Sequence, residues 1–316
     1  MGRQPLPPWD LATLLRDVPG RKTFGQPLAS LTSIRIGGPA DALVRVETLA
    51  ALRCLHAVAH EHAIPLFVLG GGSNLLIRDG GIRGIVVRLH GTFSTYDMVP
   101  SAAGSAADAA DVHVGVGYPL SRLALQLGRQ GWSGLEFAYG IPGTLGGAMV
   151  MNAGTHLGDM RQVLVSARML LRTGHVQELP ASAVGLRYRS SSYPAGAVLL
   201  GAALRLQRGE PGHSEAMMQE SYGRRQRTQP LSQPNTGSVF KNPPGTSAGH
   251  LIESRDLKGM RVGGAMISPI HANFIVNVGQ ATAADVATLM ARVQESVQRA
   301  YHIALEPEVR VVGEEG

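Results

Sequence analysis

The chain has 316 residues, of which 44% are hydrophobic and only 16% charged, so it is not a disordered protein and has ample material for a core. Its net charge of +6 suits small anionic ligands, but no basic run is interleaved with aromatic residues, so no nucleic-acid partner is expected. The single cysteine, Cys54, excludes an intrachain disulfide and a cysteine-based metal site.

The start of the chain and its apolar runs predict a cytoplasmic protein that does not enter a membrane. The stretch MGRQPLPPWD lacks the apolar segment and cleavage site of a signal peptide. The apolar run Ala195–Leu204 stops at Arg205, well short of the length that spans a bilayer.

The first ninety residues predict a small unit of helices and strands. A short helix from Trp9 to Val18 has Asp10 in position to cap its first turn. A strand over residues 40–48 and an amphipathic helix over residues 49–64 follow. Residues 65–89 hold a buried strand, a glycine turn and two more short apolar runs, so the order of elements indicates an α+β unit.

The middle of the chain is rich in short β-type runs, such as residues 111–117 and 167–179. The Ala/Ser/Gly-rich residues 100–111 predict a hairpin loop. One helix is expected over residues 119–131, ended by a glycine, and another over residues 215–230.

The last helix is predicted to begin at Thr282, which forms a capping-box pattern with Asp285. Its apolar residues follow helical spacing, so they are expected to lie in the core and not to form a cofactor box: Val286, Leu289, Met290, Val293, Val297 and Tyr301. A short strand is predicted within residues 304–316.

Three consecutive glycines follow a buried strand in VLGGGSNLLI, Val68–Ile77. Glycines let the backbone approach a ligand closely and turn several N–H groups toward it, which suits a pyrophosphate. The spacing differs from the Rossmann pattern, and no helix is expected to follow. An ordinary hairpin turn is the alternative, although three glycines exceed what a turn requires.

A second glycine-rich segment, GIPGTLGGAMVMNAG, covers Gly140–Gly154 in a stretch otherwise apolar enough to be core. Its glycines favour backbone that lies along a flat or phosphate-bearing ligand. A purely structural crossover between two elements explains them equally well.

Two segments carry charges that suit anionic groups. RYRSSSYP, Arg187–Pro194, has two arginines on the same side of a predicted strand, and arginine binds carboxylate and phosphate bidentately. In LEPEVR, Leu305–Arg310, Glu308 and Arg310 alternate with apolar residues on a predicted strand. Taken alone, both segments are equally explained by solvated surface side chains.

The stretch NTGSVFKNP, Asn235–Pro243, holds Ser238 in a basic turn directly after a glycine. It has neither the Gly-x-Ser-x-Gly elbow nor a neighbouring histidine, so it does not indicate a serine hydrolase. The histidines His56, His60 and His62 lack the HExxH order, and we predict a polar helix face there and no metal site.

These segments, taken in chain order, resemble one family. The matching stretches are SLTSIRIGGPADALV, PLFVLGGGSNLLI, GLEFAYGIPGTLGGAMVMNAG, YRSSSYP, RTQPLSQPNTGSVFKNP, SAGHLIESRDLKGMRVGGAMISPIHANFIVN and LEPEVR. Together they closely resemble the UDP-N-acetylenolpyruvoylglucosamine reductases, bacterial flavoenzymes of peptidoglycan precursor synthesis. The resemblance covers residues 25–312, and the short chain after YRSSSYP is similar to the subgroup that lacks an extra substrate-capping loop.

The resemblance implies an α+β fold with three domains. A two-part FAD-binding module of the PCMH/vanillyl-alcohol-oxidase-like type is followed by a C-terminal α+β substrate domain. The implied boundaries are residues 1–90 plus 305–316 for FAD-binding subdomain 1, 91–230 for subdomain 2, and 231–304 for the UDP-sugar domain.

The implied enzyme is a monomeric, cytoplasmic UDP-N-acetylmuramate dehydrogenase with bound FAD and NADPH as co-substrate. In a ping-pong reaction, NADPH reduces the flavin and NADP⁺ leaves. Flavin N5 then gives a hydride to the methylene carbon of UDP-N-acetylglucosamine enolpyruvate. A proton added to the adjacent carbon yields UDP-N-acetylmuramate.

The resemblance assigns three catalytic residues. Arg189 matches the arginine that contacts the substrate carboxylate, where developing charge is stabilised by a preorganised cation. Ser238 matches the proton donor. Glu308 matches the third catalytic residue, and it would need a pKa raised by burial to act in its protonated form.

Binding residues follow from the same matches. FAD contacts are implied for Gly70, Gly71, Gly72, Ser73, Asn74, Pro142, Gly143, Gly146, Gly147, Arg227 and Arg310. Substrate contacts are implied for Asn242 and His271. Gln229 stands where some relatives place a lysine for the substrate diphosphate.

Two other functions remain open on the sequence alone. A different flavin oxidoreductase on the same FAD-binding module would keep the glycine segments, but it has no reason to keep Arg189, Ser238 and Glu308 together. A non-enzymatic protein that binds flavin or a UDP-sugar would be expected to have lost at least one of these three residues, and none is missing.

Overall fold

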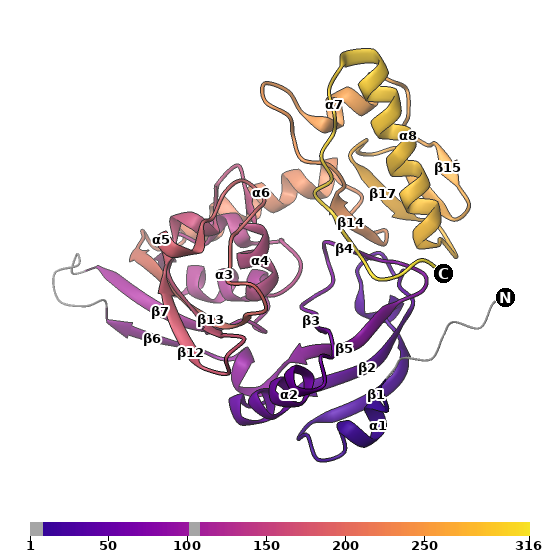
Figure 1. The fold of residues 1–316 in the computed structure, drawn as a ribbon. Coiled ribbons are helices and arrows are strands. Elements are labelled where there is room, and N and C mark those ends of the chain that lie inside the picture. The colour runs from indigo at the N-terminus through magenta and orange to yellow at the C-terminus, as the bar shows by residue number, and fades with distance from the viewer. Residues whose placement is uncertain (1–8, 101–107) are drawn as a thin grey trace.

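In this computed structural model, residues 9–100 and 108–316 are described, and they form three parts that each contain a sheet (Figure 1). The first part has a four-stranded sheet of order β1-β2-β5-β3, in which only β1 runs antiparallel to its neighbour. Its elements are α1 (Leu11–Leu14), β1 (Arg21–Pro27), a 3₁₀ turn (Ala29–Leu31), β2 (Pro39–Val46), α2 (Leu49–Glu61), β3 (Leu66–Val68) and β5 (Ile82–Leu89).

Side chains along β2 point alternately to the two faces of the sheet, and α2 covers one of these faces. Val44 and its alternating neighbours pack against Leu52 and Leu55 of the helix, as the predicted strand and amphipathic helix require. The helix at the start of the chain is shorter than predicted. Asp10 nevertheless caps it, because its carboxylate accepts a hydrogen bond from the Thr13 amide.

The second part is built on a larger, antiparallel sheet of order β12-β11-β13-β7-β6, with β8 added beside β13. Its strands are β6 (Tyr96–Pro100), β7 (Ala109–Gly115), β8 (Trp132–Ser133), β11 (Leu164–Leu170), β12 (Val176–Pro180) and β13 (Val198–Arg208), with the small pair β9 (Gly154–Thr155) and β10 (Gly158–Asp159). Its helices are α3 (Leu120–Arg129), α4 (Leu145–Met151), α5 (Ala181–Val184) and α6 (His213–Thr228), with 3₁₀ turns at Gly91–Ser94, Glu136–Ala138 and Met160–Gln162.

Both helices predicted in this part are confirmed. The helix α3 ends just before Gly131, whose φ of +79° is a conformation that glycine adopts without strain. Buried leucines of α3 pack against the sheet, among them Leu123 and Leu127. The hairpin loop predicted over residues 100–111 lies mostly outside the described residues, and β6 and β7 on either side of it pair antiparallel.

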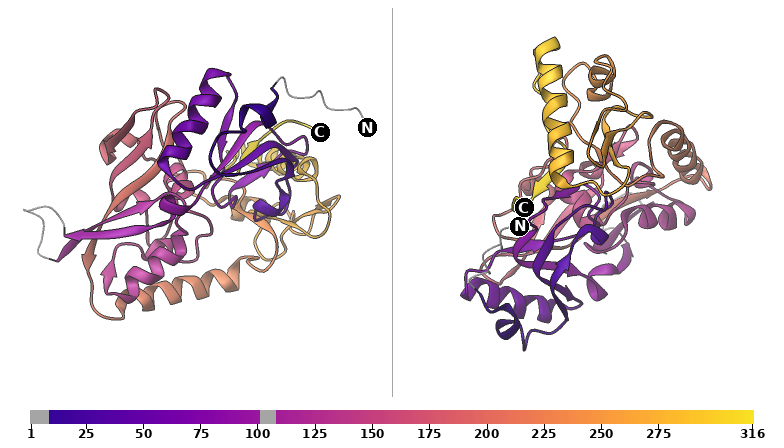
Figure 2. Two further views of the ribbon diagram at one scale, coloured as in Figure 1. Left: turned by 90° about the horizontal axis from the view of Figure 1, so that it is seen from below. Right: turned by 90° about the vertical axis from the view of Figure 1, so that its right-hand side faces the viewer.

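The third part is a four-stranded antiparallel sheet of order β14-β17-β16-β15, with the long helix α8 standing beside it (Figure 2). Its elements are β14 (Asn235–Ser238), α7 (Ala248–Glu253), β15 (Arg261–Val262), β16 (Ala265–Ile267), β17 (Phe274–Asn277) and α8 (Ala283–Tyr301).

The prediction for α8 is confirmed at its start and corrected at its end. Thr282 and Asp285 form a complete capping box. The predicted core residues from Val286 to Val297 are buried. Tyr301 is not in the core, since 37% of its surface is exposed. It is the last helical residue, directly before the left-handed His302, and lies one turn beyond Val297, the last buried residue of the helix.

Three contacts tie the third part to the first. The chain returns as β18 (Arg310–Val312), which pairs in parallel with β4 (Leu75–Ile77). Ile34 and Leu76 of the first part lie in the same hydrophobic cluster as the buried face of α8. The carboxylate of Asp79 accepts hydrogen bonds from the first two amides of α8, at 2.9 and 3.0 Å.

Helices and mostly antiparallel sheets occur together in this chain, so the predicted α+β class is confirmed. Within residues 9–100 and 108–316, no helix is both long and apolar enough to cross a membrane.

Candidate active site

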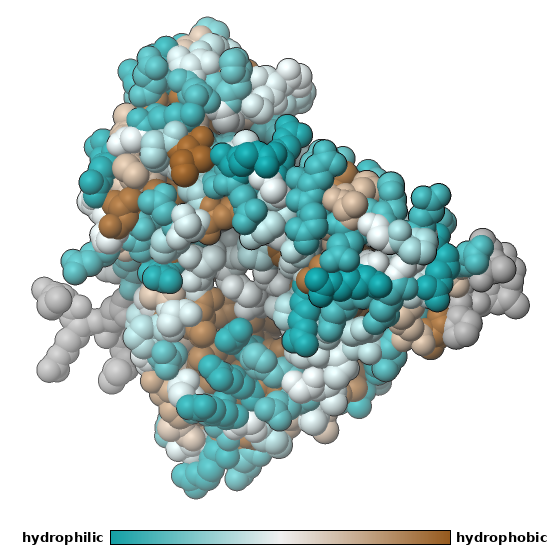
Figure 3. Space-filling model, turned by 180° about the vertical axis from the view of Figure 1, so that it is seen from behind, coloured by the Kyte–Doolittle hydropathy of each residue, from teal (hydrophilic) through white to brown (hydrophobic). Residues whose placement is uncertain are grey.

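A cavity of about 770 Å³ lies where the three parts meet, and its size suits a cofactor or a nucleotide ligand. Its lining includes the glycine loop after β3, the start of α4, the turn before β13, the end of α6, and β14. Seen from behind, the molecule is mainly hydrophilic and is indented at the centre, where hydrophobic residues come to the surface (Figure 3). The fold therefore places both glycine segments and the predicted catalytic residues around one space.

The glycine loop Gly70–Gly72 is not a hairpin turn, because β3 pairs with β5 whereas β4 pairs with β18. A Cβ at Gly71 would lie 2.5 Å from the Cα of Gly143, so the two glycine segments touch through backbone alone. Ser73 fixes the same junction, since its hydroxyl donates to the Pro142 carbonyl at 2.9 Å. The loop thus presents bare backbone to the cavity, as a phosphate-binding nest requires.

The second glycine segment leads into α4. Gly143 has a φ of +108°, and the helix begins two residues later. Gly146 packs against Val116, whereas a Cβ at Gly147 would meet nothing within 4 Å. Gly146 therefore serves helix packing, while Gly147 leaves open space on the cavity side for a ligand.

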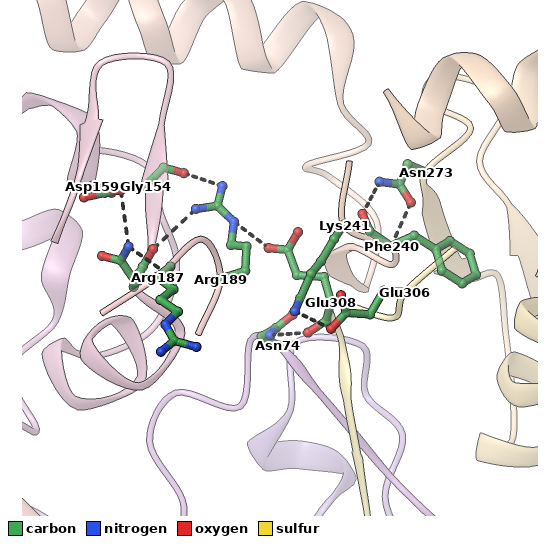
Figure 4. A network of polar contacts seen from close by, with 11 residues as sticks. Asn74, Gly154, Asp159, Arg187, Arg189, Phe240, Lys241, Asn273, Glu306 and Glu308 are labelled. Carbon is green, nitrogen blue, oxygen red and sulfur yellow. Dashed lines mark hydrogen bonds and ion pairs between the residues drawn. The ribbon is translucent and has the colours of Figure 1, made fainter. Parts of the chain in front are cut away.

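Arg189 lies in a tight turn and not on a strand, so the strand predicted over Arg187–Pro194 is wrong. Arg187 and Ser190 pair across the turn, and Arg189 has the left-handed φ of +50°. Its side chain therefore projects into the cavity while that of Arg187 points away from it (Figure 4). Buried Asn152 steadies the turn by donating from Nδ2 to the Arg187 carbonyl at 3.0 Å.

The Arg189 guanidinium is held from two sides. Its Nη2 donates to the Gly154 carbonyl at 2.8 Å, and its Nε forms an ion pair of 2.9 Å with Oε1 of Glu308 (Figure 4). Only 20% of the Arg189 side chain and 17% of the Glu308 side chain are exposed. A cation fixed in this way is preorganised for a carboxylate ligand.

Glu308 precedes the returning strand and is fixed through its backbone. Its amide donates to the Val239 carbonyl at 2.8 Å, and Asn74 Nδ2 donates to its carbonyl at 3.0 Å. Burial raises the pKa of the Glu308 carboxyl above its ordinary value, although Arg189 and Lys241 pull it down. This is the direction that Glu308 would need in order to act in its protonated form.

Ser238 reaches the cavity from a bulge in β14. The pairing of β14 with β17 shifts register between Asn235 and Ser238, and Gly237 has a φ of +77°. The Asn235 side chain accepts a hydrogen bond from the Gly237 amide at 2.8 Å, and this bond fixes the bulge. Bulges re-aim side chains, and this one directs Ser238 to the cavity, where its hydroxyl has no hydrogen-bond partner among the described residues.

Two predicted binding residues do not line the cavity. Arg227 is exposed, and its guanidinium folds back toward Gly223 on the outer side of α6. Asn242 is exposed and accepts the Ala248 amide at 3.0 Å, beside the start of α7. The other predicted residues line the cavity: Gly70, Gly71, Gly72, Ser73, Asn74, Pro142, Gly143, Gly146, Gly147, Arg189, Ser238, His271, Glu308 and Arg310.

The cavity also holds polar residues that the sequence analysis missed. Among the described residues, buried side-chain atoms without a hydrogen-bond partner include His90 Nε2, Tyr193 Oη and Arg225 Nη1, and all three residues line the cavity. Arg225 could have been found from helical spacing, because it lies one turn before Gln229 and donates to that side chain at 3.1 Å. His90 follows the apolar strand β5 and Tyr193 follows three serines, and neither position carries such a signal.

Two family models match the chain. A model described as an FAD binding domain matches residues 40–180. A model described as the C-terminal domain of UDP-N-acetylenolpyruvoylglucosamine reductase matches residues 229–312.

Whole-length relatives agree with these matches. UDP-N-acetylenolpyruvoylglucosamine reductase 2 of Symbiobacterium thermophilum is 47% identical over 304 residues, which are 96% of this chain and 96% of that protein. The reductase of Bacillus velezensis is 40% identical over 296 residues, 93% of this chain and 95% of the relative. The crystal structure of UDP-N-acetylenolpyruvylglucosamine reductase from Thermus caldophilus matches with a TM-score of 0.79 at 38% identity, over 93% of this chain and 98% of that one.

The residues around the cavity fit FAD. Bare glycine backbone at Gly71 and Gly143 suits a pyrophosphate, and the open space beside Gly147 suits a flat ring system. The unpartnered buried atoms of His90, Tyr193 and Arg225 would each leave a desolvated polar group unless a ligand satisfied them.

Proposed function

The chain belongs to the UDP-N-acetylenolpyruvoylglucosamine reductase family, FAD-dependent oxidoreductases of peptidoglycan synthesis, and on this premise we propose how its cavity carries out the reaction. When bound, FAD would supply the hydride chemistry, from NADPH through its N5 to the methylene carbon of UDP-N-acetylglucosamine enolpyruvate, and the glycine loops at Gly70–Gly72 and Gly143–Gly147 would hold it. The two half-reactions share one site in ping-pong order. The product is UDP-N-acetylmuramate.

Ser238 acts as the acid of the second half-reaction. Hydride addition leaves negative charge on the carbon next to the carboxylate, and the Ser238 hydroxyl protonates that carbon. The absence of a hydrogen-bond partner for this hydroxyl among the described residues supports the proposal, because the group is free to meet a ligand. No neighbouring base is needed, since the serine gives a proton away and is not a nucleophile.

Arg189 and Glu308 stabilise the charge that develops on the substrate carboxylate. Arg189 provides a fixed cation, which is worth more in a partly desolvated site than in water. Glu308, whose pKa is raised by burial, donates a hydrogen bond in its protonated form to the forming enediolate. Each group thus favours the intermediate over the ground state.

In this proposal the three parts of the fold bind different ligands. We assign FAD to the first two, residues 1–90 with 305–316 and residues 91–230, and the UDP-sugar to residues 231–304. His271, which lines the cavity, is the better placed of the two proposed substrate contacts. For Asn242, the hydrogen bond to the Ala248 amide indicates that it shapes the loop around α7.

One observation carries this function. Arg189, Ser238 and Glu308 come from three separate segments, yet they line the same cavity as both glycine loops. A flavin oxidoreductase for another substrate, or a non-enzymatic flavin-binding protein, would not require this convergence.

Anaerobic half-reactions test the proposal. NADPH should bleach the flavin of the purified protein, and UDP-N-acetylglucosamine enolpyruvate should restore its absorbance with formation of UDP-N-acetylmuramate. A flavin that is reduced by NADPH but stays reduced with this substrate would refute the assignment. A reduced flavin that is reoxidised by a different enoyl compound alone would support the alternative oxidoreductase.

A further inference from the structure

Glu306 lies beside the proposed catalytic residues, and the proposed reaction gives it no role. Among the described residues, Glu308 lines the cavity and Glu306 does not. The Glu306 carboxylate is 70% exposed, yet it forms an ion pair of 2.5 Å with Nζ of Lys241, whose side chain is only 19% exposed (Figure 4). A pair with one partner so open to solvent contributes little to stability. Its position next to Glu308 suggests an electrostatic effect on that residue instead.

A short antiparallel ladder brings these side chains together. Phe240 and Pro307 form an isolated bridge between the segment after β14 and the segment before β18. On one side of this bridge, the Lys241 amide donates to the Glu306 carbonyl at 2.9 Å. Lys241 is therefore directly opposite Glu306, and Glu308 lies one diagonal step along the ladder, which a long side chain can reach. The backbone alone would let Lys241 pair with either carboxylate.

Cations from two separate segments act on the Glu308 carboxyl. Burial raises its pKa, whereas the positive charges of Arg189, from the turn before β13, and of Lys241, from the segment after β14, lower it. His271 and Arg310 line the same cavity, from the loop before β17 and from β18. The protonated form of Glu308 that the proposed function needs is thus opposed by neighbouring positive charge.

Glu306 offsets one of these cations. A glutamate is ordinarily negative at neutral pH, so its pair with Lys241 carries no net charge. Figure 4 shows Lys241 joined to Glu306, whereas the Glu308 carboxylate points to Arg189. Without the Glu306 charge, the ammonium would be left unbalanced within reach of Glu308. Its attraction would then favour the ionised form of Glu308.

We propose that Glu306 is a positioning residue, which holds the Lys241 ammonium away from Glu308 and so keeps Glu308 protonated for the second half-reaction. Glu306 acts through Lys241 and not by contact with substrate or flavin. The inference rests on the proposed function, because the proton on Glu308 matters only if that group stabilises the charge on the substrate.

Glu306→Gln tests this role, because it removes the charge and keeps the size of an exposed side chain. Glu295→Gln is the matched control: Glu295 is 66% exposed and forms an ion pair of 3.6 Å with Arg299 on α8. Lys241→Met removes the cation, and the double variant Glu306→Gln/Lys241→Met shows whether Glu306 acts through it. Lys241→Gln takes the place of Lys241→Met if the latter does not fold.

Two quantities are followed across pH in each variant. The first is the pKa of the Glu308 carboxyl, measured by NMR of the FAD-loaded protein with isotope-labelled glutamate carboxyl groups, in which the signal is identified by its loss in Glu308→Gln. The second is the rate at which UDP-N-acetylglucosamine enolpyruvate reoxidises the NADPH-reduced flavin. The first measurement needs no turnover, so it tests the arrangement of charges independently of the reaction.

Glu306→Gln should lower the pKa of the Glu308 carboxyl by about 0.5–1 pH unit, because an unbalanced ammonium nearby stabilises the ionised form. The protonated form is then lost at lower pH, so the fall of the reoxidation rate at high pH should move down with the pKa. Lys241→Met should raise this pKa, because it removes a charge that lowers it. In the Lys241→Met background, Glu306→Gln should shift the pKa less than half as far as in the original protein. Glu295→Gln should shift neither quantity.

An unchanged pKa of Glu308 in Glu306→Gln would overturn the proposal. An equal shift in Glu295→Gln would also overturn it, since net charge alone would then explain the effect. A shift of half the original size or more in the Lys241→Met background would show that Glu306 acts directly and not through Lys241. If the pKa shifts as expected but the reoxidation rate does not follow it, the proposed function of Glu308 fails while the arrangement of charges stands.

Discussion

Ser238 is the residue whose proposed role differs most from what a serine usually does in an active site. Replacing it by alanine removes a proton donor that only the second half-reaction needs. We expect Ser238→Ala to be reduced by NADPH at nearly the original rate and to be reoxidised by substrate about 10²–10⁴-fold more slowly. Stopped-flow absorbance measures both steps. Ser232→Ala, on an exposed loop nearby, serves as control, and equal damage to both steps in Ser238→Ala would indicate that the serine only shapes the pocket.

Glu308 should make the rate of the second half-reaction fall at high pH. Burial raises its pKa, so the protonated form persists to higher pH than in an ordinary glutamate and is lost as the pH rises through that value. The reoxidation rate should therefore fall with increasing pH. In Glu308→Gln the amide cannot ionise, so the rate should be lower overall but no longer fall at high pH. If the reoxidation rate of the variant falls at the same pH, another group causes the fall.

Arg225 is predicted to contact a phosphorylated ligand in place of Arg227. Its Nη1 is buried without a partner among the described residues, whereas Arg227 is exposed on the outer side of α6. Arg225→Gln should weaken binding of FAD or of the UDP-sugar about tenfold or more, as expected when a charged hydrogen bond is lost. Arg227→Gln, two residues along the same helix, should change neither. The FAD dissociation constant and the substrate KM distinguish the two ligands, and matching effects of both variants would contradict the prediction.

The proposed catalytic residues could be predicted only through the family resemblance. Arg189, Ser238 and Glu308 stand far apart in the chain, and no periodicity or spacing rule brings such positions together. Their meeting depends on the turn at Arg189, the bulge at Ser238 and the returning strand after Glu308. The choice between Arg225 and Arg227, in contrast, follows from helix geometry, because only Arg225 shares a face with Gln229.

At the scale of single elements, the bulge in β14 depends on glycine. Gly237 and Gly245 both have a φ of +77°, and a Cβ at either would meet nothing within 4 Å. Alanine at either position should therefore cost about 1 kcal/mol through backbone strain alone, which lowers the melting temperature by about 2–4 °C. Only Gly237→Ala should also slow reoxidation by substrate, because the strained bulge carries Ser238. A similar loss of rate in Gly245→Ala would show that general destabilisation is the cause.

Elements with strong local signals were predicted well. The helices α3 and α8 have helical spacing of apolar residues, and a glycine or a capping box marks one end. The segment Arg187–Pro194 was predicted wrongly as a strand. Arg187 and Ser190 instead pair with each other across a tight turn. Ser191 then donates to the Val150 carbonyl of α4 at 2.6 Å, so a tertiary contact and not a neighbouring strand holds the segment.

For the molecule as a whole, the pairing of distant segments was beyond sequence patterns. A short strand near the C-terminus was predicted, but its parallel partner β4 lies more than two hundred residues earlier. A three-residue strand offers only alternation, which fixes neither partner nor register. The contact between Asp79 and α8 is equally hidden, because any exposed helix start can be capped by a distant carboxylate.

That contact leads to a prediction about how the third part is held against the first. Asp79 and Thr282 both accept hydrogen bonds from amides at the start of α8, but Asp79 belongs to the first part and Thr282 to the third. Loss of either cap should lower the free energy of unfolding by about 1 kcal/mol, measured by thermal melting. Only Asp79→Ala should also raise the KM for the UDP-sugar, because it loosens the part proposed to bind that substrate from the part proposed to hold FAD. An equal rise of KM in Thr282→Ala would mean that the KM depends on how well the first turn of α8 is ordered, and not on the contact between the two parts.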